Sequence, residues 1–504
     1  MSNPLFDRLF APLAGQTRRF LHLPGGAMLS GDAFLARGAR MAGALRAAGL
    51  EPGDRVAVQA AKSVEMLALY AGAVASGVVF LPLNPAYTGA ELEHFLRDSG
   101  ARLFVTDPDR AAALAPLAAR HGAALETLGP GGGLSARADA MPAAFAPADR
   151  APDDLAALLY TSGTTGRSKG AMLTQDNLLS NALVLAEAWQ FTDRDVLLHA
   201  LPIFHVHGLF VATHTVLAAG ASMIFQPGFD RDAVMAALPQ ATAMMGVPTF
   251  YTRLLDDARL TRDAVAHMRL FVSGSAPMSP ETHAAWTART GKPVLERYGM
   301  TETGMITSNP YEGERRPGSV GPALPGVSVR VTDPETGAAL PPGEVGMVEV
   351  AGPNVFAGYW RMPERTAAEF RADGHFITGD MGRLGDDGYL DLVGRQKDVI
   401  IAGGLNVYPA EVEAVLDAAP GVRESAVIGV PHPDLGEAVL AVIVPEPGND
   451  PDPDAIGAGL ADHLARFKQP RGYVLLDALP RNSMGKVQKA DLRARYATWF
   501  GAAG

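Results

Sequence analysis

The sequence contains no cysteine among its 504 residues. Disulfide bonds, thiolate metal sites and a cysteine nucleophile are therefore all excluded. Positive charge is also in short supply, since 43 Lys and Arg stand against 54 Asp and Glu, for a formal net charge of −11. Because proteins that bind nucleic acid concentrate Lys and Arg on one face, this balance argues against nucleic acid as the main ligand. An anionic substrate must instead be held by a few local positive groups.

The chain also lacks long uninterrupted hydrophobic segments. The N-terminal stretch "MSNPLFDRLFAPLAGQTRRF" has no basic start, long apolar core or cleavage site of a secretory signal. The most apolar stretch, residues 66–83, is broken by Gly and Pro and is better explained as a helix, a turn and a strand than as a membrane span. We therefore expect a cytoplasmic protein with no membrane span.

Short apolar runs alternate with longer helical patterns over most of the sequence. The run "RVAVQAA" from Arg55, for example, is followed by "SVEMLALYAGAVASG" and then by "VVFLPL". This alternation predicts an α/β fold with largely parallel sheets. Further along, Ser279 before Pro280 is typical of a helix start and Gly291 of a helix end, so the preceding "RLFVSGSAP" is expected to be a buried strand that ends in a polar turn.

The length indicates two to four compact units at roughly 150 residues each. Residues 128–154 are rich in Gly, Ala and Pro without a period, so we expect a surface connection there. The composition changes again near residues 394–396, beyond which Pro409 opens a helix with Val412 and Leu416 on one face. We therefore place a domain boundary there, between a large N-terminal part of residues 1–394 and a C-terminal domain of residues 395–504.

The stretch "LYTSGTTGRSKGAML" from Leu159 has the composition of a phosphate-binding loop. Gly163 and Gly166 allow the backbone to approach an anion closely, and Lys169 adds positive charge. The hydroxyl donors are Thr161, Ser162, Thr164, Thr165 and Ser168. Because Ser168 precedes Lys169 and Gly170 follows it, the order does not match the P-loop of nucleoside triphosphatases. From this loop alone, a polyphosphate site and a flexible surface turn both remain open.

Five motifs that follow one another along the chain favour the polyphosphate site over the surface turn: "YTSGTTGRSKGAMLT", "ERYGMTET", "FITGD", "GRQKDVIIAGGLNVYPAEVE" and "PRNSMGKVQK". Together they resemble the signature motifs of the adenylate-forming superfamily of acyl-CoA synthetases, adenylation domains and luciferases. Within it, "LPIFHVHGLF" and "GVPTFYTRLL" are most similar to the malonyl-CoA synthetase branch. The resemblance implies an α/β enzyme with a large multi-subdomain N-terminal domain of mostly parallel sheets and a small mobile α+β C-terminal domain. It also implies an acid–thiol ligase that spends ATP on an acyl adenylate and then transfers the acyl group to CoA.

The same resemblance assigns roles to residues of the N-terminal domain. The loop would hold the β and γ phosphates, Thr301 would contact the α-phosphate and Glu302 would bind Mg²⁺. Asp380 would accept the ribose hydroxyls with Arg395 nearby. Adenine would be enclosed by Ser275, Ala276 and Tyr298. Taken one at a time, Asp380 also fits a turn acid and Glu302 a carboxylate in a helix first turn.

In the C-terminal domain, Lys486 matches the family's catalytic lysine, whose ammonium would bridge the attacking carboxylate and the α-phosphate. Lys397 matches the hinge about which the domain would rotate between the two half-reactions. Gly403 and Gly404 match the loop that faces the CoA thiol channel. Acylation of Lys486 by a lysine acyltransferase, reversed by a deacylase, would remove its charge and is a form of regulation that the sequence leaves open.

The acid is the least determined part. Relatives that take neutral or aromatic acids commonly have Gly before the Tyr of "YGMTE", whereas this chain has Arg297. A guanidinium there would block a long apolar tail and offer a bidentate partner to a second carboxylate, although pairing with Glu296 or with ATP is the alternative. Further expected contacts of the acid's tail are His207, Val206, Met305 and Ser308. Malonate is therefore expected first and methylmalonate second.

Other interpretations remain open at this point. The chain fits a CoA ligase for another short acid such as acetate or propionate, or a stand-alone adenylation protein that loads a carrier protein. A luciferase is less compatible with an arginine in the pocket, and a catalytically inactive scaffold would not need Glu302, Asp380 and Lys486. His205 and His207 form an H-x-H pair, but two ligands without a third are weak support for a metal site.

Overall fold

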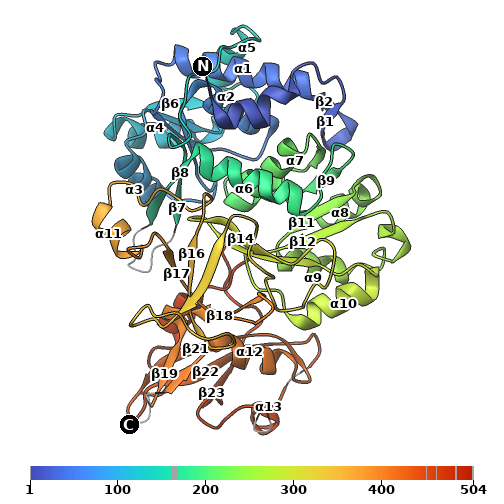
Figure 1. Ribbon diagram of the computed structural model, residues 1–504, viewed down its shortest axis with the longest axis vertical. Helices are drawn as coiled ribbons and strands as arrows, with labels where there is room; N and C mark the ends of the chain where they lie inside the picture. Colours follow the sequence, from blue (N-terminus) through green and yellow to red (C-terminus); the bar gives the residue numbers. More distant parts are fainter. Residues whose placement is uncertain are drawn as a thin grey trace.

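Two sheets of mostly parallel strands make up the greater part of the N-terminal region. The computed structural model describes residues 2–161, 168–403, 405–449, 451–460, 463–482 and 485–501 (Figure 1). The six-stranded sheet has the order β6-β5-β3-β4-β7-β8, with only the β7–β8 pair antiparallel. Its strands are β3 (Arg55–Gln59), β4 (Val79–Pro82), β5 (Leu103–Thr106), β6 (Ala124–Thr127), β7 (Leu155–Thr161) and β8 (Lys169–Thr174).

The second sheet has eight strands in the order β14-β13-β12-β11-β9-β10-β1-β2, and it is parallel except at its two ends. The strands are β1 (Arg19–His22), β2 (Met28–Ser30), β9 (Val196–His199), β10 (Ser222–Phe225), β11 (Ala243–Gly246), β12 (Leu270–Ser273), β13 (Leu295–Met300) and β14 (Gly304–Ser308). The prediction of an α/β fold with largely parallel sheets is thereby confirmed.

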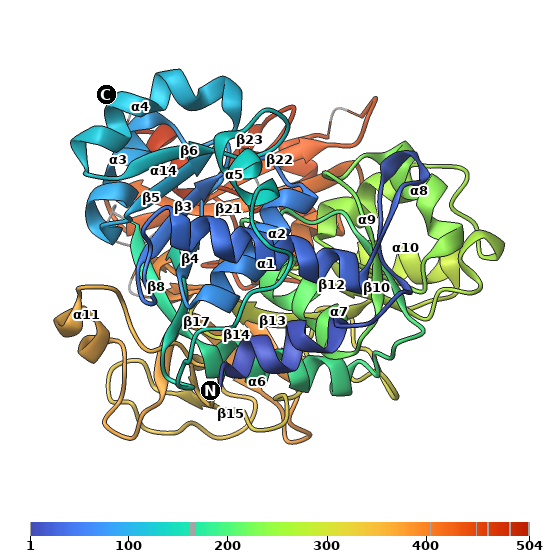
Figure 2. The same ribbon diagram turned by 90° about the horizontal axis from the view of Figure 1, so that it is seen from above.

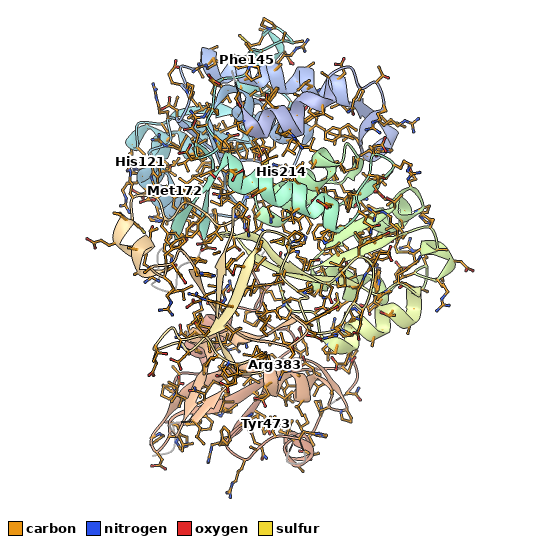
Figure 3. The ribbon with its side chains drawn as sticks, in the orientation of Figure 1. His121, Phe145, Met172, His214, Arg383 and Tyr473 are labelled. Atoms are coloured by element: carbon orange, nitrogen blue, oxygen red, sulfur yellow. The ribbon has the colours of Figure 1, made fainter. Side chains whose placement is uncertain are left out.

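Helices cover these sheets and join them through one apolar core. The longer helices are α1 (Gly31–Ala47), α2 (Val64–Ser76), α3 (Gly89–Ser99), α4 (Ala111–Arg120), α6 (Gln175–Ala188), α8 (Arg231–Ala237), α9 (Pro248–Leu255) and α10 (Pro280–Thr290). Figure 2 shows α1 and α2 side by side, and a Cβ on Gly72 of α2 would lie 2.7 Å from the Ala42 nitrogen of α1. The fully buried His214 of α7 (His214–Ala218), labelled in Figure 3, pairs with the Tyr70 hydroxyl of α2 at 2.8 Å.

Several local predictions can be compared with these elements. Residues 66–83 form most of α2, a left-handed turn at Gly77 and β4, as expected. Helix α10 begins after Ser279, whose side chain accepts from the Thr282 amide, and ends at Gly291 with φ 72°. The surface connection predicted over residues 128–154 contains a helix that the sequence did not indicate, α5 (Gly133–Asp139), which packs on α1 and has two buried side chains. Seven residues are too few to reveal a helical period.

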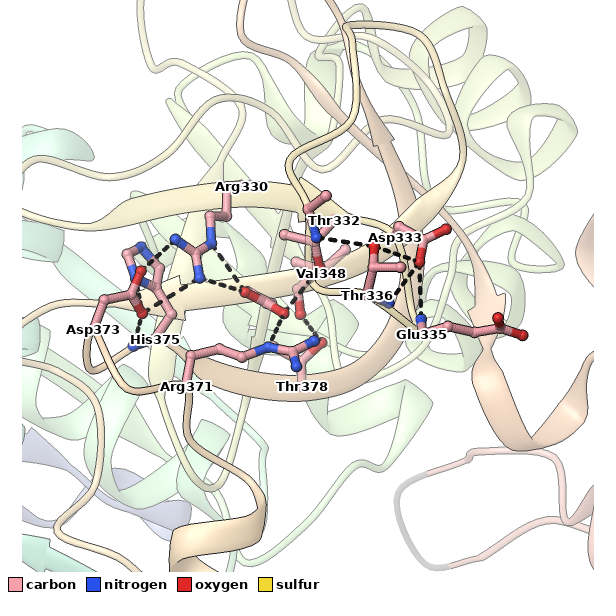
Figure 4. Close-up of polar contacts among 12 residues, drawn as sticks. Arg330, Thr332, Asp333, Glu335, Thr336, Val348, Arg371, Asp373, His375 and Thr378 are labelled. Atoms are coloured by element: carbon pink, nitrogen blue, oxygen red, sulfur yellow. Dashed lines mark hydrogen bonds and ion pairs between the residues drawn. The ribbon is translucent and has the colours of Figure 1, made fainter.

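A third sheet carries the motif "FITGD". Its four antiparallel strands are β15 (Ser328–Thr332), β16 (Gly346–Ala351), β17 (Phe376–Leu384) and β18 (Leu390–Arg395). The short helix α11 (Pro363–Ala368) precedes β17. The buried carboxylate of Glu349 accepts from Arg330, Arg371 and Thr332, at 2.9, 2.7 and 2.9 Å. Figure 4 labels these three donors. This network stabilises β16, the neighbour of β17, on the face of the sheet opposite to Asp380.

The C-terminal elements form a smaller α+β unit at the foot of the molecule in Figure 1. Its mainly antiparallel sheet contains β19 (Ile400–Ala402), β20 (Leu405–Val407), β21 (Val422–His432), β22 (Gly436–Pro445) and β23 (Gly472–Leu475). Its helices are α12 (Pro409–Asp417), α13 (Pro453–Leu460) and α14 (Lys489–Arg495). Val412 and Leu416 are buried on α12 as the spacing predicts. Among the described residues, no helix is both long and apolar enough to cross a membrane.

Candidate active site

Three of the predicted nucleotide contacts meet where β13, β17 and β18 come together. Asp380 and Arg395 are register partners on β17 and β18, and the Arg395 Nε lies 2.6 Å from the Asp380 Oδ1. The Tyr298 hydroxyl of β13 donates to the Asp380 Oδ2 at 2.5 Å. Burial has the largest single effect on Arg395 and would lower its pKa, but Asp380, Tyr298, Glu302 and Asp398 together outweigh it and raise the pKa. The carboxylate of Asp380 is therefore held in a fixed orientation by Arg395 and Tyr298, as its predicted contact with the ribose would require.

Glu302 lies in the turn between β13 and β14 and is almost fully buried. Its Oε1 accepts from the Thr161 Oγ1 at 3.1 Å and from the Tyr359 hydroxyl at 3.2 Å. Burial raises the pKa of Glu302, an effect that the charges of Arg395 and Lys169 partly offset. The prediction that the loop and Glu302 belong to one site is supported by the contact with Thr161, which ends β7 where the loop begins.

Lys169, at the far end of the loop, is 7% exposed and pairs with an acid that the sequence did not single out. Its Nζ lies 2.9 Å from the Glu369 Oε1 and 4.0 Å from the centroid of the Tyr359 ring. The same Tyr359 hydroxyl lies 2.7 Å from the Glu369 Oε2, so the Glu302 and Glu369 carboxylates share its single proton. Thr161 and Lys169 are cross-strand partners, so both side chains leave the same face of the hairpin.

The predicted loop residues Ser162, Gly163, Thr164, Thr165 and Gly166 lie outside the described residues, as does Gly404 of the predicted CoA loop. The two ends of the phosphate loop are described, and they place its base beside Glu302. His94 of α3 contacts the Ser168 carbonyl oxygen at 2.8 Å, which fixes the return of the chain into β8.

Arg297 of β13 is 4% exposed, and its Nε and Nη2 have no hydrogen-bond partner among the described residues. Burial lowers its pKa to about 9, with a small opposite effect of Tyr251. Glu296 does not neutralise it, since the Glu296 Oε1 accepts from the Gly318 amide and neighbouring strand residues face opposite sides. The guanidinium instead packs over Gly274, where a Cβ would lie 2.4 Å from the Arg297 Cζ.

His207 lies next to this guanidinium. It is fully buried at the start of a π-helical turn, His207–Thr213, and its Nδ1 is 3.1 Å from the Ser275 Oγ. Burial and the charge of Arg297 lower the pKa of His207 well below its usual range and that of His205 to about 4. Ser275 itself has φ 72°, a strained conformation for a residue other than glycine. Such strain at the end of β12 is typical of a binding site.

The other expected contacts of the acid's tail lie in different surroundings. Val206 lines a small pocket together with Thr301, so a predicted acid contact and a predicted phosphate contact share one cavity. Ser308 is committed to the protein, because its hydroxyl accepts from the Trp189 Nε1 and donates to the Asn309 carbonyl oxygen. Met305 is buried, and its methyl group packs over Gly299. Ala276, which is expected to contact adenine rather than the acid, follows Ser275 and is half-buried.

Two more basic side chains, Lys62 and His199, lie near His207 and were not found from the sequence. The Lys62 Nζ is 3.0 Å from the His199 Nδ1 and donates to the His199 carbonyl oxygen at 2.8 Å. The His199 Nε2 in turn contacts the carbonyl oxygen of Gly208, the residue after His207. Burial lowers the pKa of Lys62 well below its usual value. Neither residue lies in a recognisable motif, so only their three-dimensional proximity reveals them.

Lys486 faces this site from the C-terminal unit. Its amide donates to the Asn482 Oδ1 at 2.9 Å in a turn that rests on Thr249 of α9, where a Cβ on Gly485 would lie 3.1 Å from the Thr249 Oγ1. Desolvation in this cleft and the charge of Arg395 lower the pKa of Lys486, while Asp380 acts in the opposite direction. The side chain nevertheless keeps access to solvent. Asp380 and Arg395 are thus among the charged groups that act on the Lys486 ammonium.

Lys397 lies in a short 3₁₀ turn, Gln396–Asp398, directly after β18, and its side chain is exposed. The neighbouring Asp398 pairs with Arg493 of α14 at 2.8 Å. Gly403 is exposed with φ 59° at the tip between β19 and β20, flanked by the exposed side chains of Ile401 and Leu405.

A metal centre built from protein ligands alone has no support in the described part of the chain, where no group of three or more His, Cys, Asp or Glu is suitably placed. His205 and His207 therefore remain without a third ligand there. A single buried carboxylate such as Glu302 is nevertheless a sufficient protein contribution for Mg²⁺, which usually takes one or two carboxylates plus phosphate oxygens and water. The donor set thus fits a metal that arrives together with a polyphosphate.

Comparison with known proteins adds family information to this geometry. Residues 15–360 match the model of an AMP-binding enzyme, and residues 411–486 match the C-terminal domain of AMP-binding enzymes. A feruloyl-CoA synthase from Amycolatopsis is 39% identical over 477 residues, covering 94% of this chain and 95% of that protein. A malonate–CoA ligase from Arabidopsis thaliana is 35% identical over 476 residues, covering 88% of this chain and 78% of that protein.

Among solved structures, ATP-bound MatB from Rhodopseudomonas palustris is similar over 99% of this chain and 100% of its own, with 55% identity and a TM-score of 0.97. The apo form of the same protein gives a TM-score of 0.86 at the same identity and coverage. The overall arrangement of this chain is therefore more similar to the ATP-bound form than to the apo form.

Proposed function

From the premise that this chain belongs to the AMP-binding enzyme family and is a CoA ligase, we propose that its acid is malonate. The reaction would convert malonate, ATP and CoA into malonyl-CoA, AMP and pyrophosphate. Methylmalonate, which adds one methyl group, is the next candidate. The observation that carries this proposal is the buried guanidinium of Arg297, which has a charge but no carboxylate partner within the described protein.

A buried cation without a partner is costly, so its presence indicates that a ligand supplies the missing anion. Malonate carries a second carboxylate one methylene away from the one that reacts. Because a guanidinium binds a carboxylate through two parallel hydrogen bonds, Arg297 would select this group by geometry as well as by charge. Neutral His207 would then donate or accept one further hydrogen bond beside it.

Ferulate is the main competing acid, since the feruloyl-CoA synthase is as similar in sequence as the malonate–CoA ligase. An aromatic tail requires apolar volume, whereas Arg297 occupies the space over Gly274 with a charged group. Burying ferulate against that group would leave the guanidinium unpaired. The pocket chemistry therefore favours a short dianion over a long neutral tail.

For the first half-reaction we assign the carboxylate oxygen as the nucleophile at the α-phosphorus, with pyrophosphate as the leaving group. Lys486 would stabilise the charge that develops between the two groups, and Thr301 would hold an α-phosphate oxygen. Asp380 and Arg395 would orient the ribose. Mg²⁺, when bound at Glu302, would neutralise phosphate charge.

In the second half-reaction the CoA thiol would attack the acyl carbon, AMP would leave and the thiol proton would pass to solvent. Lys486 would have to leave the reacting groups before CoA can enter, so we assign a rotation of residues 395–504 about Lys397 to this step. Support comes from the greater similarity to the ATP-bound than to the apo relative, which differ in their TM-scores at equal identity. The exposed tip around Gly403 would then move toward the thiol.

The test is a panel of acids followed by pyrophosphate release with and without CoA. Malonate should give the highest kcat/KM, followed by methylmalonate, with acetate, propionate and ferulate far below. Sulfoacetate tests the charge argument separately, because its sulfonate offers the same charge with a different shape. A preference for ferulate or acetate over malonate would reject the assignment of the acid but not membership in the family.

A further inference from the structure

Two cations, Arg395 and Lys169, act on the charge of Glu302, and yet Glu302 has no ion-pair partner among the described residues. Arg395 is bound to Asp380. Lys169 reaches the same Tyr359 ring as Glu302: Glu302 lies 3.2 Å from its hydroxyl, and Lys169 lies above its face, 4.0 Å from the centroid. Lys169 pairs with Glu369 instead, at 2.9 Å. A lysine that is 7% exposed requires such a partner.

Glu369 is built into this position by several contacts. Its Oε2 accepts from the Tyr359 hydroxyl at 2.7 Å, and its Oε1 also pairs with Arg365 of α11. The amide of Ile377 in β17 donates to the Glu369 carbonyl oxygen at 2.8 Å, so the backbone is fixed as well. Tyr359 thus stands between two carboxylates, with its ring under the ammonium of Lys169.

We infer that Glu369 is a positioning residue that holds Lys169 away from Glu302 and so keeps the Glu302 carboxylate available for a divalent cation. This inference rests on the proposed role of Glu302 as the metal ligand. Without the Glu369 charge, Lys169 would remain buried and the closest carboxylate left to it would be Glu302, across the Tyr359 hydroxyl. An ammonium on that carboxylate would exclude the metal by occupying its oxygens and cancelling its charge.

The chemistry of the neighbourhood explains why the separation matters. Mg²⁺ binds through few protein ligands, so losing its one carboxylate removes most of the protein's contribution to its binding. Residues behind a metal ligand typically change metal affinity by about 10- to 100-fold when they are replaced. Glu369→Gln should therefore weaken metal binding by about 10-fold or more, while the adenine and ribose contacts remain.

The experiment measures the Mn²⁺ concentration that half-saturates the enzyme–ATP complex, read from the electron paramagnetic resonance of free Mn²⁺, without acid so that no turnover occurs. Glu369→Gln should raise that concentration, and the double variant Lys169→Met with Glu369→Gln should restore it, because the competing ammonium is then gone. Glu369→Asp, which keeps the charge, should stay near the unmodified protein. ATP binding in EDTA, followed by calorimetry, reports whether each variant folds and binds nucleotide.

Asp98→Asn is the matched control. Like Glu369, Asp98 is half-buried and accepts a hydrogen bond from a tyrosine. Its donor is the Tyr160 hydroxyl, at 2.6 Å, in the β7–β8 hairpin that contains Lys169, but Asp98 lies outside the Glu302 cluster. Its Mn²⁺ half-saturation should not change. Glu302→Gln serves as the reference for complete loss of the protein ligand.

The outcomes separate the inference from the proposed function. If Glu302→Gln leaves Mn²⁺ binding unchanged, the proposed metal ligand is wrong. If Glu302→Gln weakens it but Glu369→Gln does not, or the double variant fails to recover, the positioning role of Glu369 is wrong and the metal ligand stands. Tighter ATP binding by Glu369→Gln in EDTA would also overturn the inference, because Glu369 would then compete with phosphate for Lys169.

Discussion

Replacing Arg297 tests the substrate assignment and the energetics of the pocket together. The drop of its pKa from the usual 12.5 to about 9 corresponds to a destabilisation of the folded, ligand-free chain by up to about 5 kcal/mol. At pH 7 the folded and the unfolded chain both keep this group protonated, so the whole penalty applies there. It decreases only as the pH rises through 9, where the folded chain can release the proton.

Arg297→Met should therefore lose malonate activity while gaining stability. Truncating one partner of a buried, hydrogen-bonded charge pair costs about 2–5 kcal/mol, which is about 30- to 5,000-fold in kcat/KM. The ligand-free variant should unfold at a higher temperature, because a methionine fills similar volume without a charge. Arg297→Lys keeps the charge but not the two parallel hydrogen bonds, so its kcat/KM for malonate should lie between the values of the unmodified protein and of Arg297→Met.

The assays are pyrophosphate release at varied malonate and thermal unfolding with and without malonate. Arg383→Met is the control, since Arg383 is an exposed arginine that pairs with Asp391 at 3.2 Å and with no other acid in the described part of the chain. Arg297→Gly adds a second arm, because it opens the space over Gly274 and should admit butyrate. Unchanged malonate kinetics in Arg297→Met would refute the argument, and so would a loss of stability of several kcal/mol with activity retained.

Four further predictions follow from other parts of the molecule. Lys486→Ala should slow adenylation by about 10²- to 10³-fold while CoA transfer from preformed acyl adenylate survives; equal loss of both steps in single-turnover assays would reject its role. Lys397→Pro should retain adenylation and lose thioester formation, measured as pyrophosphate against malonyl-CoA yield, and unchanged overall turnover would exclude the hinge. Glu349→Leu should leave Arg330 and Arg371 without their buried partner and cost about 3–5 kcal/mol in urea unfolding; a midpoint shift near zero would show that the network adds no stability. Burial raises the pKa of Asp417 from 3.8 to about 7, so its charge destabilises the fold increasingly between those values and fully above 7, and Asp417→Asn should raise the unfolding temperature at pH 8 but not at pH 4; equal changes at both pH values would contradict this.

The elements that sequence reasoning found are those whose pattern is local. The turn of β12 into α10, for example, is encoded by Ser279, Pro280 and Gly291 within a few residues, and each adopts the expected conformation. Helix α5 was missed because its stability comes from packing on α1 rather than from its own sequence. The same distinction applies to the domain boundary near residues 394–396, which stays a prediction because it concerns motion rather than local structure.

The candidate site shows the same limit more strongly. Motifs placed Asp380, Tyr298 and Arg395 in one group, and the structure brings them within hydrogen-bond distance. Tyr359 and Glu369 gave no signal, because their importance depends on reaching Lys169 and Glu302 from a distant part of the chain. A sequence motif also does not show which hydrogen bonds a side chain makes. The hydroxyl of Ser308, expected to contact the acid, is hydrogen-bonded to the Trp189 Nε1 and the Asn309 carbonyl oxygen.

The distribution of charge links these observations to function. The chain as a whole carries a formal net charge of −11, yet the buried guanidinium of Arg297 has no carboxylate partner among the described residues. His205 and His207 do not supply a counter-charge, since burial and the charge of Arg297 lower the pKa values of both and keep them neutral. Around Lys169 the opposite arrangement holds, since Glu369 neutralises it. A fold selected for stability alone would pair both cations, because buried unpaired charge is costly. We therefore expect the anion of the substrate at the unpaired Arg297, and a free path for a cation to Glu302 beside the paired Lys169.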